Sequence, residues 1–349
     1  MHISNFKWKR CLILGIVIIT LTLSLLVVYS LWTPGKDVID GSHDRKHNGI
    51  WLQHGWLGDD EWFERNNRQK LISYFRNVNN TRQLASILKD HHITDLYPHL
   101  CPALPDGVIP AVDEKQTKLF LKEFVDFRVM PWVGGVSGVQ AFPANPDWRK
   151  TFTQSICQLL QQFPQFKGIH INIEPCRSGN ADFINLLQQL RTALPEDKIL
   201  SVAAYPPPTI WHPFPEVHWD EDYYRQVTLY ADQVVVMSYD TAIHLEKIYQ
   251  HVMADWSRKA LTWSGGKSVL LGVPAYDDEG VGYHTPKVEN ISNALLGIHA
   301  GLRSFKLLPK NYQGVALYCE WKMDETEWQY LKKHFLNTEQ KKQYHTPRK

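Results

Sequence analysis

Short apolar runs alternate with longer amphipathic segments from residue 48 to residue 336, and this alternation restricts the fold more than any other feature. It predicts repeated βα units, in which each strand is followed by a helix. The eight predicted strands are residues 49–54, 93–98, 127–133, 168–174, 199–205, 233–239, 268–276 and 313–319. Helical patterns separate several of them, for example residues 115–125, 147–163, 180–194 and 244–259.

Eight such units favour a closed (β/α)8 barrel, the TIM barrel, over an open doubly wound sheet. An open sheet would normally carry a glycine-rich phosphate loop after its first strand, and the sequence HGWLGDDEW at that place does not fit one. The glycine-rich segment 134–140 lacks the Lys-Ser/Thr that ends a P-loop, so we expect a plain loop there. The sequence therefore predicts an α/β TIM-barrel domain over residues 48–336 and indicates no cofactor.

The N-terminal part of the chain carries one long apolar segment. Residues 11–32 contain no charged side chain, and these 22 residues would rise about 33 Å as a helix, enough to cross a hydrocarbon core roughly 30 Å thick. Lys7, Lys9 and Arg10 precede the segment, and such a positive flank keeps the N-terminus in the cytoplasm. The prediction is a single-pass transmembrane signal-anchor. A cleaved signal peptide is the alternative, although its apolar core usually has only about 7 to 15 residues.

This interpretation divides the chain into successive parts. They are a basic cytoplasmic tip at 1–10, the transmembrane segment at 11–32, a polar linker at 33–47, the barrel at 48–336 and a polar tail at 337–349. The barrel would lie on the extracytoplasmic side of the membrane.

The charge balance argues against one class of partner. The chain has 38 Lys and Arg residues against 36 Asp and Glu residues, a formal net charge of +2, whereas a nucleic-acid-binding protein would present a basic face. Hydrophobic residues make up 44% and charged residues 21%, which is typical of a globular protein and excludes a disordered chain. We therefore predict no nucleic acid partner, and the sequence identifies no protein partner.

Four of the five cysteines lie in the part that would be translocated: Cys101, Cys157, Cys176 and Cys319. An oxidising compartment permits disulfides. Cys101 and Cys176 each follow a predicted strand and could pair, although four cysteines allow three connectivities and four buried thiols are the alternative. The sequence contains neither a CxxC pair nor an HExxH motif, so its spacing indicates no metal site.

Aromatic side chains recur where the predicted strands end. The strand C-termini form the functional face of such a barrel, and the rings near them are Trp51, Trp56, Tyr97, Trp132, Tyr205, Tyr239, Tyr276 and Trp321. Flat rings suit the apolar faces of sugars, although aromatic residues in strands also pack in cores. We expect this rim to bind an oligosaccharide or polysaccharide. The proline-rich loop 206–219 adds Trp211 and Trp219 and could wall a cleft.

The fourth predicted strand carries the clearest chemical signal. In a strand with period two, His170, Asn172 and Glu174 face the barrel axis, while the isoleucines between them face the helices. Glu174 stands at the strand end, where partial burial could raise the pKa of its carboxyl group and suit it to general acid catalysis. The alternative is a purely structural network, because buried polar groups need hydrogen-bond partners.

This strand gives the chain a resemblance to a known family. The segment KGIHINIEP is similar to the fourth-strand signature DGxDxDxE of glycoside hydrolase family 18, the chitinase-like barrels. Gly168 and Glu174 match the signature, while Lys167, His170 and Asn172 stand where the family has aspartates.

Two further positions extend the resemblance. MSYD, from Met237 to Asp240, resembles the sixth-strand MxYD motif of the family, and Trp321 falls where the family places a tryptophan under the reactive sugar. The three sites occur in the order that the fold requires. The resemblance therefore spans roughly residues 48–336.

The resemblance implies substrate-assisted hydrolysis of a glycan that contains N-acetylhexosamine, an exception to the two-carboxylate scheme. Glu174 would protonate the glycosidic oxygen while the 2-acetamido carbonyl of the sugar attacks the anomeric carbon. Tyr239 would hydrogen-bond the acetamido group, Asp240 would assist substrate binding and Trp321 would form the floor.

Two replacements set this chain apart from the family signature. Asn172 stands where an aspartate orients the acetamido group, and a neutral amide can still accept a hydrogen bond from the acetamido N–H. Endo-β-N-acetylglucosaminidases of family 85 resemble this arrangement. His170 replaces another aspartate deeper in the barrel and would change the charge beneath the acid. We also expect His170 to contact the substrate.

Three other functions remain open. One is a barrel that has lost catalysis and only binds glycans. Another is a retaining glycosidase that uses Glu174 as the acid and Asp277, Asp278 or Glu279 as the nucleophile, with the two carboxyl groups about 5 to 5.5 Å apart. The third is a structural envelope protein whose rim aromatics only pack.

Overall fold

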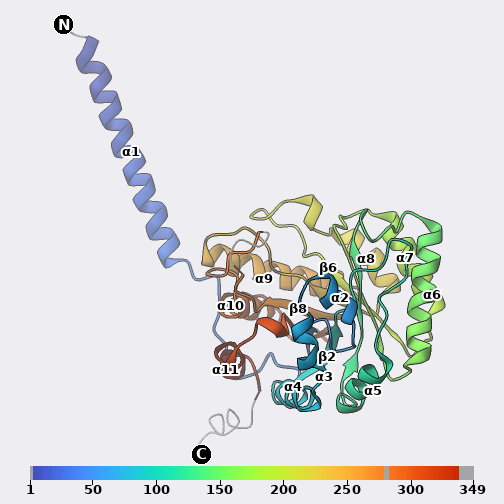
Figure 1. The fold of residues 1–349 in the computed structure, drawn as a ribbon. Helices are drawn as coiled ribbons and strands as arrows, with labels where there is room; N and C mark the ends of the chain where they lie inside the picture. Colours follow the sequence, from blue (N-terminus) through green and yellow to red (C-terminus); the bar gives the residue numbers. More distant parts are fainter. Residues whose placement is uncertain (1–2, 279–282, 338–349) are drawn as a thin grey trace, which may run out of the picture.

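The computed structural model describes residues 3–278 and 283–337 and shows a parallel sheet curled into a barrel with helices around it (Figure 1). The strands are β1 (Asn48–Leu52), β2 (Ile93–Pro98), β3 (Arg128–Val129), β4 (Trp132–Val136), β5 (Gly168–Glu174), β6 (Ile199–Ala204), β7 (Gln233–Val236), β8 (Ser268–Pro274) and β9 (Tyr312–Tyr318). They hydrogen-bond in the order β3-β2-β1-β9-β8-β7-β6-β5-β4, with all named pairs parallel. The predicted TIM barrel is confirmed.

The nine strands occupy the eight strand positions of the barrel, because β3 and β4 are two halves of one interrupted strand. Met130 and Pro131 separate them, and Pro131 has no N–H to continue the ladder. The Met130 N–H still donates to a carbonyl of β2, and the Pro131 carbonyl accepts from the His170 N–H, each at 2.9 Å. His99 also pairs with Trp132 in an isolated parallel bridge. These backbone contacts close the barrel.

Helices follow most strands and cover the outside of the barrel. They are α2 (Asp60–Arg65), α3 (Ile72–Arg76), α4 (Val78–Asp90), α5 (Glu114–Glu123), α6 (Pro146–Gln162), α7 (Ala181–Ala193), α8 (Glu221–Tyr230), α9 (Glu246–Trp263), α10 (Ile291–Leu302) and α11 (Glu325–His334), with 3-10 turns η1 (Gln69–Leu71), η2 (Pro215–Val217) and η3 (Glu320–Lys322). Their apolar faces pack on the β-branched outer side chains of the strands, such as Ile169, Ile171 and Ile173 of β5.

Most of these helices begin at a carboxylate or amide side chain that accepts a backbone N–H of the first turn. The capping residues are Asp59, Asn77, Asp113, Asn145, Asn180, Asp220, Asn290 and Asp324. At α11 the cap is reciprocal, because the Glu327 carboxylate accepts from the Asp324 N–H in return. The caps satisfy N–H groups that a helix start leaves without partners.

Gly134 and Gly135 lie in β4 rather than in the plain loop that we expected from their composition. A Cβ atom on Gly134 would lie 1.8 Å from the Asn172 carbonyl oxygen, and its φ of +143° suits glycine. The glycine therefore lets β4 approach β5 closely beside Asn172.

A buried polar network crosses the interior of the barrel below the strand ends. Trp51 Nε1 donates to His170 Nε2 at 3.2 Å, which assigns the proton of the neutral imidazole to Nδ1, 2.8 Å from the Ser201 hydroxyl oxygen. The Ser201 and Tyr97 hydroxyls both donate to Gln233 Oε1, at 2.7 and 2.9 Å. Burial lowers the pKa of His170 to about 3, so the ring stays neutral.

The network ends in an ion pair. Gln233 Nε2 donates to Asp95 at 2.7 Å, and Arg128 donates to both Asp95 oxygens, at 2.6 and 2.8 Å. His170 and Tyr97 are each 0% exposed, and their polar atoms bond within the network. The sugar contact that we expected of these two side chains is therefore not available, because both lie in the core beneath the functional face.

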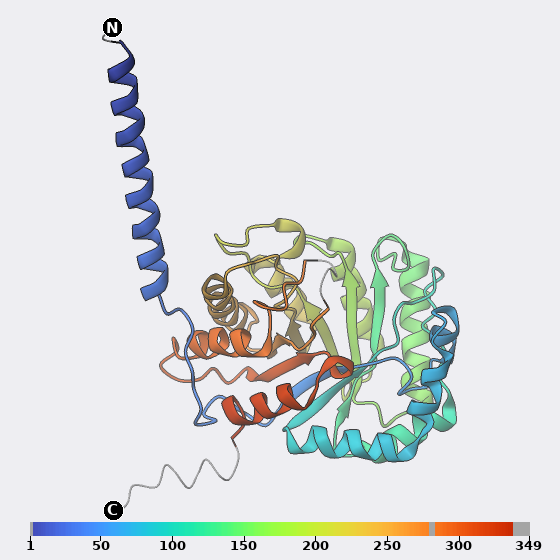
Figure 2. The same cartoon turned by 60° about the vertical axis from the view of Figure 1, so that its left-hand side comes forward.

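The N-terminal helix α1 (Ile3–Leu31) projects away from the barrel (Figures 1 and 2). Its segment Cys11–Leu31 is long and apolar enough to cross a membrane, and the structure buries none of it. A signal anchor and a signal peptide both fit these properties.

Segment 33–47 lies on the barrel surface instead of hanging free. His43 and Asp44 are buried, and Asp44 Oδ2 lies 2.5 Å from His92 Nδ1 and accepts the Asn337 N–H at 2.9 Å. The path from α1 to β1 is thus fixed to the domain.

All five cysteines are free thiols. The expected pair of Cys101 with Cys176 is not formed, because the two thiols face different neighbours. Cys101 Sγ donates to the Trp132 carbonyl at 3.5 Å, and Cys176 Sγ lies 3.7 Å from the Tyr223 hydroxyl. The alternative of buried free thiols therefore describes Cys101, Cys176 and Cys319, while Cys157 is half-buried.

Candidate active site

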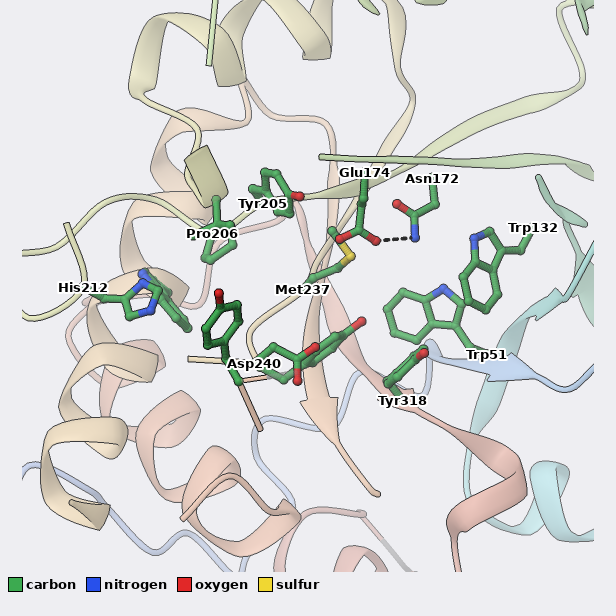
Figure 3. A pocket seen from close by; sticks show the side chains of 14 residues that line it. Trp51, Trp132, Asn172, Glu174, Tyr205, Pro206, His212, Met237, Asp240 and Tyr318 are labelled. Atoms are coloured by element: carbon green, nitrogen blue, oxygen red, sulfur yellow. Dashed lines mark hydrogen bonds between the residues drawn. The ribbon is translucent and has the colours of Figure 1, made fainter. Parts of the chain in front are cut away.

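A pocket of about 260 Å³ opens at the C-terminal ends of the strands (Figure 3). It brings together these predicted site residues: Trp51, Trp132, Asn172, Glu174, Tyr205, Tyr239 and Asp240. The other lining residues were not predicted individually, and they are Pro206, His212, Val217, Met237, Trp256, Tyr283 and Tyr318. The side chains that line the pocket therefore come from strands all around the barrel, as expected for the functional face of this fold.

Glu174 ends β5 and points into this pocket (Figure 3). Burial raises the pKa of its carboxyl group, and the charge of nearby Asp240 raises it further. Hydrogen bonds from Asn172 and Tyr205 oppose this rise without cancelling it. A carboxyl group that holds its proton at a higher pH than usual can act as a general acid.

Asn172 supports Glu174 from two residues earlier on the same face of β5. Its Nδ2 donates to Glu174 Oε1 at 2.9 Å, which fixes the amide orientation. Its Oδ1 is buried and has no hydrogen-bond partner. A buried acceptor without a partner carries a cost of about 1–3 kcal/mol, and a ligand N–H in the pocket would remove it.

Aromatic rings enclose the space in front of the acid. Tyr239 and Tyr318 stack with their centroids 4.9 Å apart, and Trp51 stands edge-on to both, at 6.4 and 5.5 Å. Trp132 closes the same wall, and its indole N–H is buried with no partner. The pocket thus combines an apolar ring surface with unpaired donors and acceptors, which is the chemistry that a sugar requires.

Trp321 does not line this pocket, although we expected it to form the floor. β9 ends at Tyr318, and the turn η3 then carries Trp321 into a neighbouring hollow beside Glu320 and Tyr74. Tyr318 takes the place in the pocket instead. The period-two alternation of the strand could have identified it, since Ala316 faces the barrel interior and Tyr318 shares its face.

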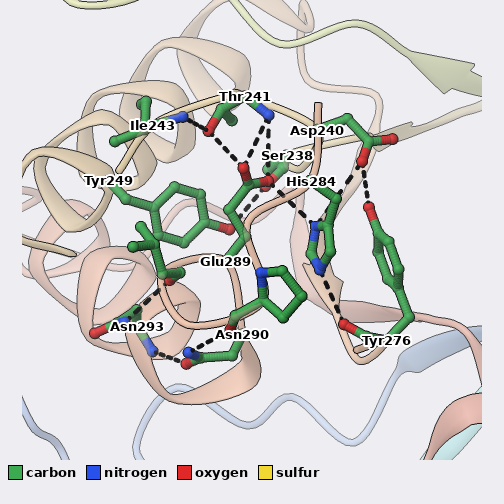
Figure 4. Close-up of polar contacts among 12 residues, drawn as sticks. Ser238, Asp240, Thr241, Ile243, Tyr249, Tyr276, His284, Glu289, Asn290 and Asn293 are labelled. Atoms are coloured by element: carbon green, nitrogen blue, oxygen red, sulfur yellow. Dashed lines mark hydrogen bonds and ion pairs between the residues drawn. The ribbon is translucent and has the colours of Figure 1, made fainter. Parts of the chain in front are cut away.

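Tyr276 lies behind Asp240 and not in the pocket (Figure 4). Its hydroxyl donates to Asp240 Oδ1 at 2.5 Å, and its ring stacks on His284 with centroids 3.8 Å apart. The His284 Nε2–H in turn donates to the Tyr276 carbonyl at 2.9 Å. Tyr276 therefore positions the aspartate and cannot stack on a sugar.

His284 stands between two carboxylates. Its Nδ1 lies 3.6 Å from Glu289 Oε2 and 3.9 Å from Asp240 Oδ1. Burial alone would lower the pKa of His284, but Glu289, the Tyr276 carbonyl and Asp240 together raise it above its usual value. Glu289 is itself 0% exposed and accepts from the Thr241 N–H and hydroxyl. A proton on Nδ1 would neutralise part of this buried negative charge.

The same three side chains are the candidate metal ligands. The ligand atoms of Asp240, His284 and Glu289 all lie within 4.8 Å of one another. One nitrogen and two carboxylate oxygens could hold a divalent cation, and the bond from the other ring nitrogen to a carbonyl is the support that metal-bound histidines use. The sequence did not indicate this cluster, because His284 and Glu289 carry no metal-site spacing.

The carboxylates proposed for a two-carboxylate mechanism lie elsewhere. Asp278 pairs with Lys322, and Asp277 Oδ1 is 3.8 Å from the same amine with its side chain 85% exposed. Neither residue lines the pocket around Glu174. Glu279 lies outside the described residues. Among the residues that the structure describes, the other carboxyl group lining the pocket is that of Asp240.

A second hollow of about 350 Å³ continues past Glu174 on the other side. It shares Trp132, Asn172 and Glu174 with the main pocket. Its far wall is a run of rings in which His54 lies 3.9 Å from Trp62 and 3.6 Å from His99, centroid to centroid. The acid therefore stands in the middle of a cleft, where a bond inside a longer saccharide could lie.

A family model matches most of the chain. The model of glycosyl hydrolases family 18 covers residues 70–346. No curated protein matches the chain.

Three solved structures of similar fold come from bacteria. The spore cortex-lytic enzyme SleL of Bacillus cereus superposes with a TM-score of 0.54 at 13% identity, over 83% of this chain and 74% of that one. A chitinase from Bacteroides thetaiotaomicron gives 0.52 at 13% identity, over 86% and 99%. A chitinase from Chromobacterium violaceum gives 0.50 at 16% identity, over 71% and 94%. Identities this low establish the shared fold alone.

Proposed function

Because the chain belongs to glycosyl hydrolases family 18, we propose that it hydrolyses a glycan containing N-acetylhexosamine by substrate-assisted catalysis, with Glu174 as the general acid. The observation that carries the proposal is the pair of Glu174 and Asn172: a carboxyl group of raised pKa beside a buried amide oxygen without a partner. A mechanism in which the substrate supplies the nucleophile needs one enzyme carboxyl group instead of two.

In the first step Glu174 donates its proton to the glycosidic oxygen. The acetamido carbonyl oxygen of the sugar bonds to the anomeric carbon as the bond to the leaving oxygen breaks, so an alcohol departs and a cyclic oxazolinium ion remains. In the second step the Glu174 carboxylate takes a proton from water, whose oxygen adds to the anomeric carbon and reopens the ring. The raised pKa of Glu174 favours the protonated form that the first step requires.

Asn172 would hold the nucleophile through its free Oδ1, by accepting the acetamido N–H. This bond aims the acetamido carbonyl at the anomeric carbon, and alignment of this kind lowers the barrier. An amide carries no charge, so it stabilises the positive oxazolinium ion less than a carboxylate would. Asp240, which lines the same pocket, adds negative charge near the reacting sugar.

Tyr239 would bind the other end of the acetamido group. Burial raises the pKa of its hydroxyl well above the usual value, so the proton is retained and can be donated to the acetamido carbonyl oxygen. Trp51 and Tyr318 supply apolar ring surface beside it.

We further propose that α1 is an uncleaved signal anchor, with the N-terminus in the cytoplasm and the barrel outside. Its length and composition support this topology, as does the basic flank of Lys7, Lys9 and Arg10. The enzyme would then act on glycans within reach of the membrane surface.

The test is Glu174→Gln in the full chain, purified in detergent and assayed on chitin oligosaccharides, peptidoglycan and N-glycans with products identified by mass spectrometry. We expect a loss of about 10²–10⁴-fold in turnover, the usual contribution of a general acid, with little change in the thermal unfolding midpoint. Glu61→Gln, whose parent side chain is 76% exposed, is the matched control. Full activity in Glu174→Gln would falsify the assignment.

A glycan-binding barrel without turnover is the second candidate, and the uncharged Asn172 is the observation that favours it. Isothermal titration of the wild-type chain with the same oligosaccharides separates the two. Tight binding with no product after prolonged incubation would support the binding protein and reject the enzyme.

A further inference from the structure

The end of α1 is fastened to the barrel by one helix. Lys247, in the first turn of α9, donates to the carbonyls of Tyr29 and Ser30, each at 2.8 Å. These are carbonyls that the end of a helix leaves without partners. The rings of Trp32 and His251 also lie 5.3 Å apart. The direction of α1 relative to the barrel is therefore set by side-chain contacts.

The same helix reaches a loop at the pocket. Lys259 of α9 donates to the Pro208 carbonyl at 2.8 Å. Twelve residues of helix separate Lys259 from Lys247, or about 18 Å. Figures 1 and 2 both show α9 and the yellow loop 207–217 on the side of the barrel from which α1 leaves, with the loop somewhat above the lower end of α1.

This loop presents large apolar side chains to solvent. Ile210 is 87%, Trp211 47% and Phe214 54% exposed. Full burial of such a side chain is worth about 1.5–3 kcal/mol, so their joint exposure marks a surface that meets an apolar partner. The loop cannot easily fold back to hide them, because prolines stiffen it and His212 fastens it through a contact with the Thr241 carbonyl at 3.0 Å.

We propose that loop 207–217 is a second membrane contact, in which Ile210, Trp211 and Phe214 enter the interfacial layer of the bilayer that α1 spans. The inference rests on the proposed anchor. Tryptophan and other apolar side chains are favoured at this depth, and α9 fixes the loop relative to the anchor. His212 and Val217 of the same loop line the catalytic pocket, so one wall of the pocket lies at the lipid surface.

The experiment uses the full chain in phosphatidylcholine nanodiscs, with Cys11 and Cys157 replaced by serine and an environment-sensitive NBD fluorophore on one new cysteine. Ile210→Cys reports the loop, and Leu25→Cys reports the anchor. Val125→Cys, whose parent side chain is 72% exposed just after α5 on the part of the barrel away from α1, is the matched control. Lipids that carry a doxyl quencher at a shallow or a deep position measure contact with the bilayer.

We expect shallow quenchers to reduce emission at position 210 several-fold more than at 125, with a blue shift at 210 only, and deep quenchers to act at position 25. Quenching at 25 without quenching at 210 would overturn the inference and leave the anchor intact. No quenching at either position would reject the anchor itself, and the inference with it. A response at 210 to added chitin oligosaccharide but not to quencher lipids would assign the loop to the sugar cleft and also overturn the inference.

Discussion

Two polar side chains of β5 lie only two residues apart and have opposite environments. His170 is 0% exposed, and both of its ring nitrogens have partners in the barrel interior. Asn172 donates a hydrogen bond from Nδ2 to Glu174, and its Oδ1 has no partner at the pocket. In the interior network below the strand ends, the polar groups satisfy one another and stabilise the barrel. At the strand ends some are left open, and these are the ones available to a ligand.

The largest expected effect tests the buried polar network in the barrel interior. Arg128→Met leaves the Asp95 carboxylate, which is 0% exposed, without its cation. We expect the free energy of unfolding to fall by about 3 kcal/mol, the lower part of the range for a broken buried pair, because the Arg128 side chain is 36% exposed. Urea unfolding followed by tryptophan fluorescence measures this change.

The control for that variant is Arg82→Met, which breaks a pair at the surface between Arg82, 59% exposed, and the half-buried Glu123. Surface pairs contribute about 0–1 kcal/mol, so its unfolding curve should nearly overlay that of the wild-type chain. Equal curves for Arg128→Met and Arg82→Met would mean that the interior network does not stabilise the barrel.

The next effect tests the aromatic wall of the pocket at the strand ends. Tyr318→Ala removes a ring that stacks on Tyr239 and lines the pocket, whereas Trp321→Ala removes a ring that lines another hollow and meets Tyr318 edge-on at 5.9 Å. A buried aromatic side chain contributes about 1.5–3 kcal/mol, so we expect oligosaccharide affinity to fall by about 10- to 100-fold in the first variant and to stay near wild type in the second. Isothermal titration checks this, and the reverse ranking would restore Trp321 as the floor.

The sequence predicted the barrel well because the alternation of apolar runs is a local property. Each predicted strand overlaps an observed strand, although Met130 and Pro131 divide the third. Strand alternation and short motifs also place four site residues at one rim, and the structure has all four in one pocket: Glu174, Asn172, Tyr239 and Asp240.

The site residues that were predicted wrongly share a physical cause. How far a side chain lies below the pocket, and where the chain turns after a strand ends, both depend on the tertiary structure. The alternation of side chains along a strand shows that His170 faces inward, but it does not show that His170 lies below the pocket. Tyr97 is hidden for the same reason, and the turn η3 redirects Trp321. His284 joins Asp240 only through the path of a long loop, which no local pattern encodes.

A smaller effect follows from placing a charge at the open amide. Asn172→Asp puts a carboxylate beside Glu174, and a like charge at that distance raises the pKa of the acid further. Because Glu174 must be protonated to act, the alkaline limb of the kcat/KM profile should move to higher pH. Asn185→Asp on the exposed face of α7 is the control. A limb that moves to lower pH, or does not move, would contradict the role of Glu174 as the acid beside this amide.

The smallest effect concerns the cluster behind Asp240, which is buried like the interior network but holds a histidine between two carboxylates. His284 has a folded pKa above its usual value of 6.5. A raised pKa means that the protonated form stabilises the fold, so this contribution is complete below about pH 6.5 and is lost as the pH rises through the folded pKa. The unfolding free-energy difference between the wild-type chain and His284→Gln should therefore be largest in mild acid and shrink toward alkaline pH.

His244→Gln, which removes an exposed histidine near the same loop, is the control for the substitution itself. A difference for His284→Gln that does not vary with pH but disappears on chelation would mean that a cation, and not a proton, joins Asp240 to Glu289. Either result separates this cluster from the interior network, where burial lowers the pKa of His170 to about 3 and keeps its ring neutral. Both histidines are buried, but only His284 has carboxylates beside it, and these raise its pKa against the effect of burial.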